Sequence, residues 1–472
     1  MGAGGYLKLV NGTPYAWKKV DGHRHQMNDA TFSDHIGAFS TNTVYFEFHN
    51  PALGNWFDSE AWITYEMEGT NFRFCIWCHR KENGPRIILQ LICMNTVTNK
   101  EGDKIDLGWV ENPASSWKFN GVSCIISGRD GAFVTSAARN PLVHKNWMSR
   151  ELHTIGGLTL REICIPGTHN SGMFKVSWRT PIAHKFVTQN QSRSIKEQLE
   201  LELGVRFFDL RPAFDEDGKW FYAHHISYLD KKLEYQGALG DWIGYMVNQI
   251  NEFTRDHKEI IILNISHALN IHTGYKPFDH WTWVKLFKDE LDRLENLFVA
   301  DPGEDITKIK LGDMLDSGRR AAVIIRMDYD QPSGNDQHRV GERHGRGYFY
   351  KHNFPLFDEY ADANDAETLI DDQVKKMKAQ RNHMSPVDGK VFMMSWALTQ
   401  HTEDAIKAIA AGAFFGPDLM EWARHSMTPR LGVLYDRCFG RCFPNVIGLD
   451  GVETTDGLAM TFAINEWQRS KR

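Results

Sequence analysis

The sequence lacks any run that approaches the roughly 20 consecutive apolar residues of a membrane-spanning helix. Its opening, MGAGGYLKLV, has neither the basic and apolar regions of a secretory signal nor a myristoylation motif, because Tyr6 stands where Ser or Thr is required. We therefore do not expect an integral membrane protein. The location stays open, with the cytoplasm as the default.

Other absences narrow the class of protein. The seven cysteines are an odd, scattered set, which argues against a disulfide framework. Cys75 and Cys78 have the spacing of a metal pair but lie in a strand-like run, where alternation points their side chains to opposite faces, so we expect packing. With 54 Lys and Arg against 60 Asp and Glu and no basic stripe, we expect no nucleic-acid partner.

The composition is that of a globular chain of more than one domain. Hydrophobic residues make up 42% of the 472 residues, enough to build packed cores. Residues 1–145 read as short β-runs separated by Gly, Asn and Pro, which predicts an all-β sandwich acting as an accessory domain. These runs are YLKLVN, TVYFEFH, AWITYEME, FRFCIWCH, RIILQLICMN and SCIISG.

Residues 146–472 alternate strand-like and amphipathic helical runs, which is typical of parallel α/β folds. Ser194 and Glu197 form a capping box that opens a helix, and Gly204 can end it. Eight strand candidates predict a TIM-type (β/α) barrel. They are REICIPG, VRFFDLR, KWFYAHH, EIIILNIS, AAVIIRMD, YFYKHNFPLF, KVFMMSW and NVIGLD.

Chemistry in such a barrel gathers where the strands end. Two imidazoles, a guanidinium and carboxylates at one mouth are the groups that acid–base cleavage of a phosphodiester requires. The strand-end residues are His169, Asn170, Asp209, Arg211, His224, His225, Ser266, His267, Arg326, Asp328, Trp396 and Asp450.

The amino-acid sequence at these strand ends is more specific than the residue types alone. The segments ICIPGTHNSGMF, QSRSIKEQLELELGVRFFDLRP and FYAHH together resemble the X-domain of phosphatidylinositol-specific phospholipase C. The resemblance covers about residues 155–470 and is closer to the bacterial and metal-independent members than to the calcium-dependent signalling enzymes. It implies a phospholipase C-like phosphodiesterase acting on a membrane phospholipid, with peripheral membrane contact.

The resemblance also implies roles for individual residues. His169 would be the general base that deprotonates the inositol 2-hydroxyl, and His225, preferred over the neighbouring His224, the general acid for the leaving oxygen. Arg211 would hold the nonbridging phosphate oxygens. Asp450 would orient the base histidine, although a strand-end turn role remains open for it.

Further matches to the family are looser. Asp358 and Tyr360 resemble the Asp-x-Tyr pair that binds the inositol ring, and Arg326 resembles an inositol-contacting arginine; each could equally be a solvated loop residue. A lysine that some bacterial members use on substrate is replaced here by Ser266 or His267, so His267 becomes a candidate for substrate contact.

One departure bears on metal binding. Bacterial members usually have Asp after the histidine of this motif, bracing the arginine, whereas this chain has Asn170, which the calcium-dependent class uses as a ligand. That class also needs carboxylates where Arg211 and Ser266 stand. Calcium gathers about 6–8 oxygens, and Asn170 with Asp209 is a poor start. We therefore expect no metal and no cofactor, with calcium at Asn170 and Asp209 as the less favoured alternative.

Three functional hypotheses follow. The first is a phosphodiesterase that cleaves a phosphoinositide or glycosylinositol lipid. The second is a catalytically weakened lipid-binding or toxin-like protein, motivated by Asn170 and the missing lysine. The third is a metal-dependent glycerophosphodiesterase or sphingomyelinase D-like enzyme, which ranks last because Arg211 stands where acidic magnesium ligands are wanted. For residues 1–145 we predict that deletion spares activity on soluble substrate and reduces activity on vesicles.

Overall fold

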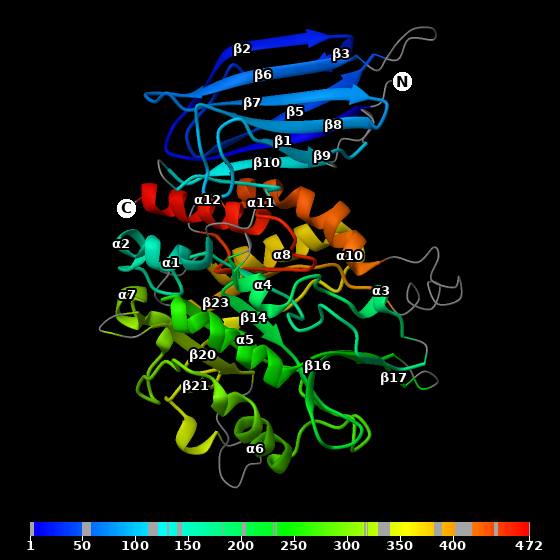
Figure 1. Ribbon diagram of the computed structural model, residues 1–472, viewed down its shortest axis with the longest axis vertical. Helices are drawn as coiled ribbons and strands as arrows, with labels where there is room; N and C mark the ends of the chain where they lie inside the picture. Colours follow the sequence, from blue (N-terminus) through cyan, green and yellow to red (C-terminus); the bar gives the residue numbers. More distant parts are fainter. Residues whose placement is uncertain are drawn as a thin grey trace. The chain divides into compact units, whose positions relative to one another are not determined.

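The computed structural model divides the chain into two compact units (Figure 1). The first unit comprises Met1–Val143, His425–Gly440 and Thr454–Arg472, and the second comprises His144–Arg424 and Arg441–Glu453. The structure describes residues 4–49, 58–111, 121–129, 132–138, 144–181, 183–200, 204–229, 231, 234–315, 318, 320–328, 340–381, 389–401, 418–438 and 442–471.

Two β-sheets form the body of the first unit and share one hydrophobic core. Strands such as β6 alternate buried and half-exposed residues, so one face of each sheet turns inward. In order, the first sheet holds β11 (Val134–Thr135), β10 (Gly121–Ser127), β1 (Gly4–Gly12), β5 (Ser40–Phe48) and β3 (Met27–Ala30). The second holds β4 (His35–Ile36), β2 (Trp17–His25), β6 (Glu60–Met67), β7 (Arg73–Lys81), β8 (Gly84–Ile92) and β9 (Lys104–Gly108).

Every described element within residues 4–138 is a strand, and segments from later in the chain add helices to the first unit. Two helices from the end of the chain, α11 (Leu431–Arg437) and α12 (Asp456–Ser470), pack on β1 and β10 (Figure 1). The close approach of α12 depends on Gly12, since a Cβ there would lie 2.5 Å from the Cβ of Ala463. The sequence analysis placed these helices in the second domain, because contacts between distant segments leave no local pattern.

An eight-stranded, entirely parallel sheet forms the centre of the second unit. In order it holds β21 (Tyr348–Phe349), β20 (Ala322–Met327), β18 (Ile260–Ile265), β14 (Phe207–Leu210), β12 (Ile165–Thr168), β24 (Val446–Leu449), β23 (Val391–Trp396) and β22 (Leu356–Phe357). Most of its strands are buried throughout, as strands covered on both faces are.

The predicted closed TIM-type barrel is wrong. The sheet curls, but β21 and β22 are its two edges, and within the described residues no ladder joins them. Each of these strands is only two residues long, and the segment between them forms turns. Little extended backbone is therefore available to pair the two edges and close the sheet. The weak run YFYKHNFPLF, predicted as one strand, supplies both edges.

The third predicted barrel strand is also wrong. KWFYAHH forms β16 (Phe221–Tyr228), which lies in a separate sheet and pairs antiparallel with β15 and β17. The reason is the length of the connection: residues 211–220 include the turn at Asp215–Gly218, and such a short link suits a hairpin and not a parallel crossover. This sheet holds β13 (Trp178–Arg179), β17 (Tyr235–Trp242), β16, β15 (Pro212–Phe214) and β19 (Leu269–Asn270).

Helices surround the parallel sheet. The predicted capping box is present, because the Ser194 N–H donates to Glu197 and the Glu197 N–H donates to Ser194 Oγ. Within the described ranges, no helix combines the length and apolar composition needed to cross a bilayer. The helices of this unit are α1 (Trp147–Arg150), α2 (Leu152–Ile155), α3 (Lys185–Thr188), α4 (Ile195–Glu200), α5 (Ile243–Asp256), α6 (His280–Asp289), α7 (Leu311–Met314), α8 (Ala366–Arg381) and α10 (Leu419–Trp422).

Candidate active site

A cavity of about 480 Å³ lies in the second unit at the carboxyl ends of its parallel strands. β12, β14, β18 and β23 contribute their last residues or those that follow, and β16 contributes from the antiparallel sheet. Most of the residues singled out from the sequence meet here. Its wall includes His169, Asp209, Arg211, His225, His267, Asp358 and Tyr360.

His169 and Asp450 form a hydrogen-bonded pair at one side of the cavity. His169 Nδ1 lies 2.9 Å from Asp450 Oδ1, and Asp450 is only 4% exposed. A carboxylate can only accept, so Nδ1 carries the proton and the Nε2 lone pair is left as the basic atom. The second carboxylate oxygen accepts from Asn190 Nδ2 at 3.2 Å. The pair therefore has the geometry of an imidazole base held in one tautomer.

Arg211 and Asp209 form the second pair. Arg211 Nε donates to Asp209 Oδ2 at 3.0 Å, and the same oxygen accepts from the backbone N–H of Asn170. Burial alone would raise the pKa of Asp209, but the charges of Arg211, His169 and His267 and the Asn170 N–H lower that pKa to about 2. The carboxylate therefore stays ionised and fixes the guanidinium at the cavity wall.

The adjacent histidines of β16 have different environments. His224 is 3% exposed, and backbone groups occupy both ring nitrogens: Nε2 donates to the carbonyl of His267, and Nδ1 accepts from the Ile226 N–H. The half-buried His225 donates from Nδ1 to the Thr188 carbonyl at 3.3 Å, which leaves Nε2 without a backbone partner. Only His225 thus has a ring nitrogen available for chemistry.

Both imidazoles are held neutral. Burial lowers the pKa of His224 to about 4, against the hydrogen bond to His267, which raises it. Burial, together with the positive charge of Arg211, lowers the pKa of His225 to about 3. In the free protein His225 therefore carries no proton on Nε2 at neutral pH.

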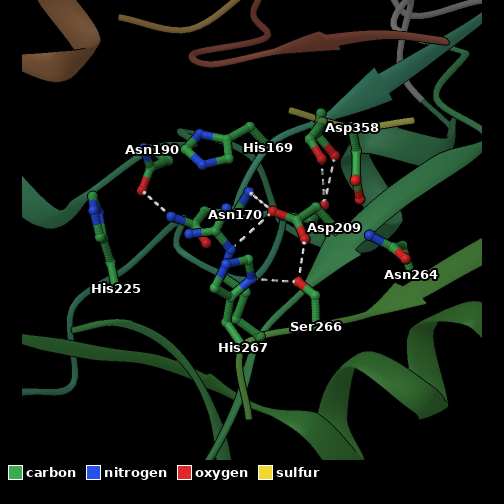
Figure 2. A network of polar contacts seen from close by, with 12 residues as sticks. His169, Asn170, Asn190, Asp209, His225, Asn264, Ser266, His267 and Asp358 are labelled. Atoms are coloured by element: carbon green, nitrogen blue, oxygen red, sulfur yellow. Dashed lines mark hydrogen bonds and ion pairs between the residues drawn. The ribbon is translucent and has the colours of Figure 1, made fainter. Parts of the chain in front are cut away.

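A third imidazole, His267, faces the cavity through a relay. Ser266 Oγ donates to Asp209 Oδ1 at 3.0 Å, so its oxygen is left to accept from His267 Nδ1 at 2.9 Å (Figure 2). Burial and the charge of Arg211 lower the pKa of His267. His267 therefore offers a neutral Nε2 acceptor at the cavity wall.

Of the residues proposed to bind inositol, two line the cavity and one is buried behind its wall. Asp358 and the 56%-exposed Tyr360 line the cavity. Burial raises the pKa of Asp358, and Asp328 adds to the rise while Arg326 opposes it. Arg326 itself does not line the cavity: it is 1% exposed and donates to Asn264 and Asp328. It supports the carboxylates of the wall from behind.

The oxygens of Asp209, the carboxylate of the less favoured calcium alternative, already have partners. Asp209 Oδ2 is occupied by the Arg211 guanidinium, which would repel a cation, and Oδ1 accepts from Ser266. Asn170 offers one unpartnered oxygen, Oδ1. Within the described residues, no group of three or more His, Cys, Asp or Glu side chains is arranged to hold a metal.

Asn190 is the site residue that the sequence analysis missed. Asn170 Nδ2 donates to Asn190 Oδ1 at 3.1 Å (Figure 2). Asn190 Nδ2 in turn donates to Asp450, so Asn190 bridges the two residues. It lies in the segment QNQS between β12 and α4, where its only visible sequence feature is a glycosylation sequon. No strand end marks it, so its role depends on the folding of that segment over the cavity.

Comparison with known proteins identifies the family that the site resembles. No family model matches the chain. Over 178 residues the chain is 24% identical to PI-PLC X domain-containing protein 3 of Bos taurus. It is 24% identical over 180 residues to the Mus musculus protein of that name and 23% over 178 residues to the Homo sapiens one. The resemblance to the PI-PLC X-domain family is confirmed.

The match to the PI-PLC X-domain proteins is partial. Each comparison covers 33% of this chain and 50% of the relative. The chain thus spans about half the length of the curated relatives it matches. The similarity supports a PI-PLC-like family, while activity, substrate and partners remain to be argued from the site.

Proposed function

We propose that the protein is a PI-PLC-like phosphodiesterase that cleaves a phosphoinositide or glycosylinositol lipid at a membrane surface. The observation that carries the proposal is the hydrogen bond that the buried Asp450 accepts from His169, which lines the same cavity as Arg211 and His225. A base of fixed tautomer, an anion-binding guanidinium and a second imidazole are the set that phosphodiester cleavage requires.

The reaction runs by intramolecular attack. His169 Nε2 removes the proton of the inositol 2-hydroxyl, and the resulting bond from that oxygen to phosphorus displaces the glycerol oxygen. His225 Nε2 gives a proton to the leaving oxygen, so the products are inositol 1,2-cyclic phosphate and diacylglycerol. Arg211 stabilises the charge on the nonbridging oxygens.

His225 must gain its proton when substrate binds. Its pKa of about 3 reflects burial next to the positive charge of Arg211. A phosphodiester monoanion against Arg211 offsets that charge and raises the pKa of His225. We therefore expect the acid to form in the complex and not in the free protein.

The wall of the cavity favours a headgroup without extra phosphates. Among its described residues Arg211 is the one Lys or Arg, whereas Asp328, Asp358 and Glu359 are acidic. Carboxylates accept from sugar hydroxyls and repel phosphate monoesters. We expect faster cleavage of phosphatidylinositol than of its bisphosphate, measured on mixed micelles of equal charge; the reverse preference would contradict this reading of the wall.

The deciding experiment is phosphorus NMR of the product from phosphatidylinositol, with and without a chelator. Cyclic phosphate formed at the same rate in both samples supports the proposal. Acyclic inositol phosphate as the first product, or turnover that stops with chelator and returns with calcium, would contradict the mechanism.

The second candidate is a catalytically weakened lipid-binding protein. The low pKa of His225 favours it, because an imidazole that stays neutral is no acid. Full vesicle binding by the His169→Ala/His225→Ala double variant, with no cyclic phosphate from the unsubstituted protein, would support this candidate instead.

A further inference from the structure

Asn170 and Asn190 connect the two carboxylates of the site. Asp450 Oδ2 accepts from Asn190 Nδ2, Asn190 Oδ1 accepts from Asn170 Nδ2, and the Asn170 backbone N–H donates to Asp209 Oδ2. The distances are 3.2, 3.1 and 3.3 Å. Asn170 and Asn190 are each 1% exposed, so solvent does not compete for these bonds.

The direction of this chain of bonds is set at one end. Asp450 can only accept, so Asn190 must turn its NH₂ group toward Asp450 and its oxygen toward Asn170. Residue 170 must therefore be a donor. Asn170 satisfies this with Nδ2, and its own Oδ1 has no partner in the described part of the chain.

A carboxylate at position 170 could not take the same place. It would face Asn190 Oδ1 with a second acceptor, or force the Asn190 amide to flip and turn its oxygen toward Asp450. The backbone does not choose between the two residue types, because Asn170 has a φ of +44° and both Asn and Asp tolerate this region. The side-chain donor is what distinguishes them.

We propose that Asn170 and Asn190 are positioning residues that hold the His169–Asp450 pair and the Arg211–Asp209 pair in one hydrogen-bonded unit, which requires an amide at position 170. The inference rests on the proposed function for its catalytic consequence. It reinterprets the departure of Asn170 from the bacterial pattern: the amide is a working part of the site and no sign of a weakened one.

A double-mutant cycle on the full chain tests the unit. Asn170→Asp and Asn190→Leu each lower kcat by roughly 10- to 100-fold, as loss of a residue that orients a reacting group does. The double variant is no slower than Asn190→Leu alone, because the acceptor at position 170 then has no opposing oxygen. Wild-type kcat in Asn170→Asp, or single effects that multiply, would overturn the proposal.

A second measurement needs no turnover. The Nδ1–H proton of His169, which bonds to Asp450, is observed by NMR in the unliganded protein and assigned by its loss in His169→Gln. Asn190→Leu removes a donor from Asp450, so that carboxylate accepts more strongly from Nδ1–H and the proton resonance moves downfield. Asn248→Leu, an exposed position on α5, is the matched control and leaves the resonance unchanged.

These two measurements separate the possible failures. An unchanged His169 Nδ1–H resonance in a folded Asn190→Leu protein would overturn the bridge even if lipid is cleaved. A shifted resonance in a protein that makes no cyclic phosphate would support the bridge and reject the proposed function. If Asn190→Leu does not fold, Asn190→Ser, which is too short to reach both partners, replaces it in the cycle and the NMR measurement.

Discussion

At the scale of single residues, the site works through fixed proton positions. Asp450 holds His169 in one tautomer and, because it can only accept, turns the NH₂ group of Asn190 toward itself. The two histidines of β16 differ by the same logic: His224 gives both nitrogens to the backbone, while His225 keeps one free. Hydrogen-bond direction therefore assigns the roles more sharply than residue type does.

Asp450→Asn tests the tautomer. If Asn170 Nδ2 keeps Asn190 in its present orientation, Asn190 Nδ2 pairs with the oxygen of the introduced amide, so the NH₂ group faces His169 and forces its proton onto Nε2, where the proposed base needs a lone pair. We expect kcat to fall by about 10³- to 10⁴-fold with little change in KM. Asp450→Ala, which leaves the tautomer free, should be less damaging in the same steady-state assay. A more active Asn than Ala variant would contradict the argument.

His224 makes stability depend on pH. Its pKa is about 4 in the folded protein against an ordinary value of 6.5, so the unfolded chain binds the proton first as the pH falls. Stability from this group is present above pH 6.5 and is lost between pH 6.5 and about 4. From pH 7 to pH 5 the loss amounts to about 2 kcal/mol.

Urea unfolding at these two pH values measures that loss. His224→Gln can keep the donor to the His267 carbonyl and carries no titrating group, so it should lose about 2 kcal/mol less than the unsubstituted protein over this interval. Equal losses in both proteins would show that His224 is not held neutral.

At the scale of elements, one glycine sets the distance between the loop that carries His169 and strand β16, which carries His225. Gly172, in the IPGTHNSG segment after β12, lies against β16 and α5: a Cβ there would overlap the Cβ of Ala223 and lie 3.0 Å from Sδ of Met246. This contact brings the loop of His169 and Asn170 next to the strand that carries His225. Gly172 therefore allows the loop after β12 to pack closely against β16 and α5.

Gly172→Ala should lower the free energy of unfolding by about 1–3 kcal/mol, the usual cost of overpacking. Activity should fall as well, because relief of the overlap moves the His169 loop away from β16. Chemical denaturation measures the first effect. Gly157→Ala is the control, since a Cβ there meets nothing within 4 Å; an equal effect of both substitutions would refute the packing explanation.

At the scale of the whole molecule, the chain contributes to its first unit from both ends. α12 buries an apolar face that includes Leu458, Ala459 and Phe462 and packs on β1 and β10. Truncation at residue 145 therefore does not remove a complete unit. It removes the sheet on which two later helices depend.

This arrangement changes the expected result of deleting residues 1–145. The truncated chain should bind a hydrophobic dye, aggregate and lose its cooperative thermal transition, because α12 then exposes its apolar face. Vesicle activity of such a chain would not report on membrane targeting. A monomeric truncated protein that unfolds at the same temperature as the full chain would contradict this expectation.

The elements of the fold that could be predicted are those with a local hydrophobic pattern in the sequence. Seven of the predicted strand segments do lie in the parallel sheet, because continuous apolar runs such as EIIILNIS read as buried strands. The exception is KWFYAHH, where the short link before the strand indicates an antiparallel hairpin. The prediction of a closed barrel was wrong because closure depends on whether β21 pairs with β22. These two edge strands are two residues long, and so short a segment carries no sequence signal for its pairing partner.

For the site, the sequence by itself determined which reactive side chains follow the strand ends, and the tertiary structure decided their partners. Motif residues such as His169, Arg211 and His225 could be named in advance, since reactive side chains follow strand ends and their chemistry belongs to their type. Asn190, the burial of Arg326 behind the wall and the end of the chain packing on the first sheet could not. A hydrogen bond between residues far apart in sequence exists only once folding has brought donor and acceptor together, and this is the physical reason that the tautomers and pKa values of the site belong to the fold.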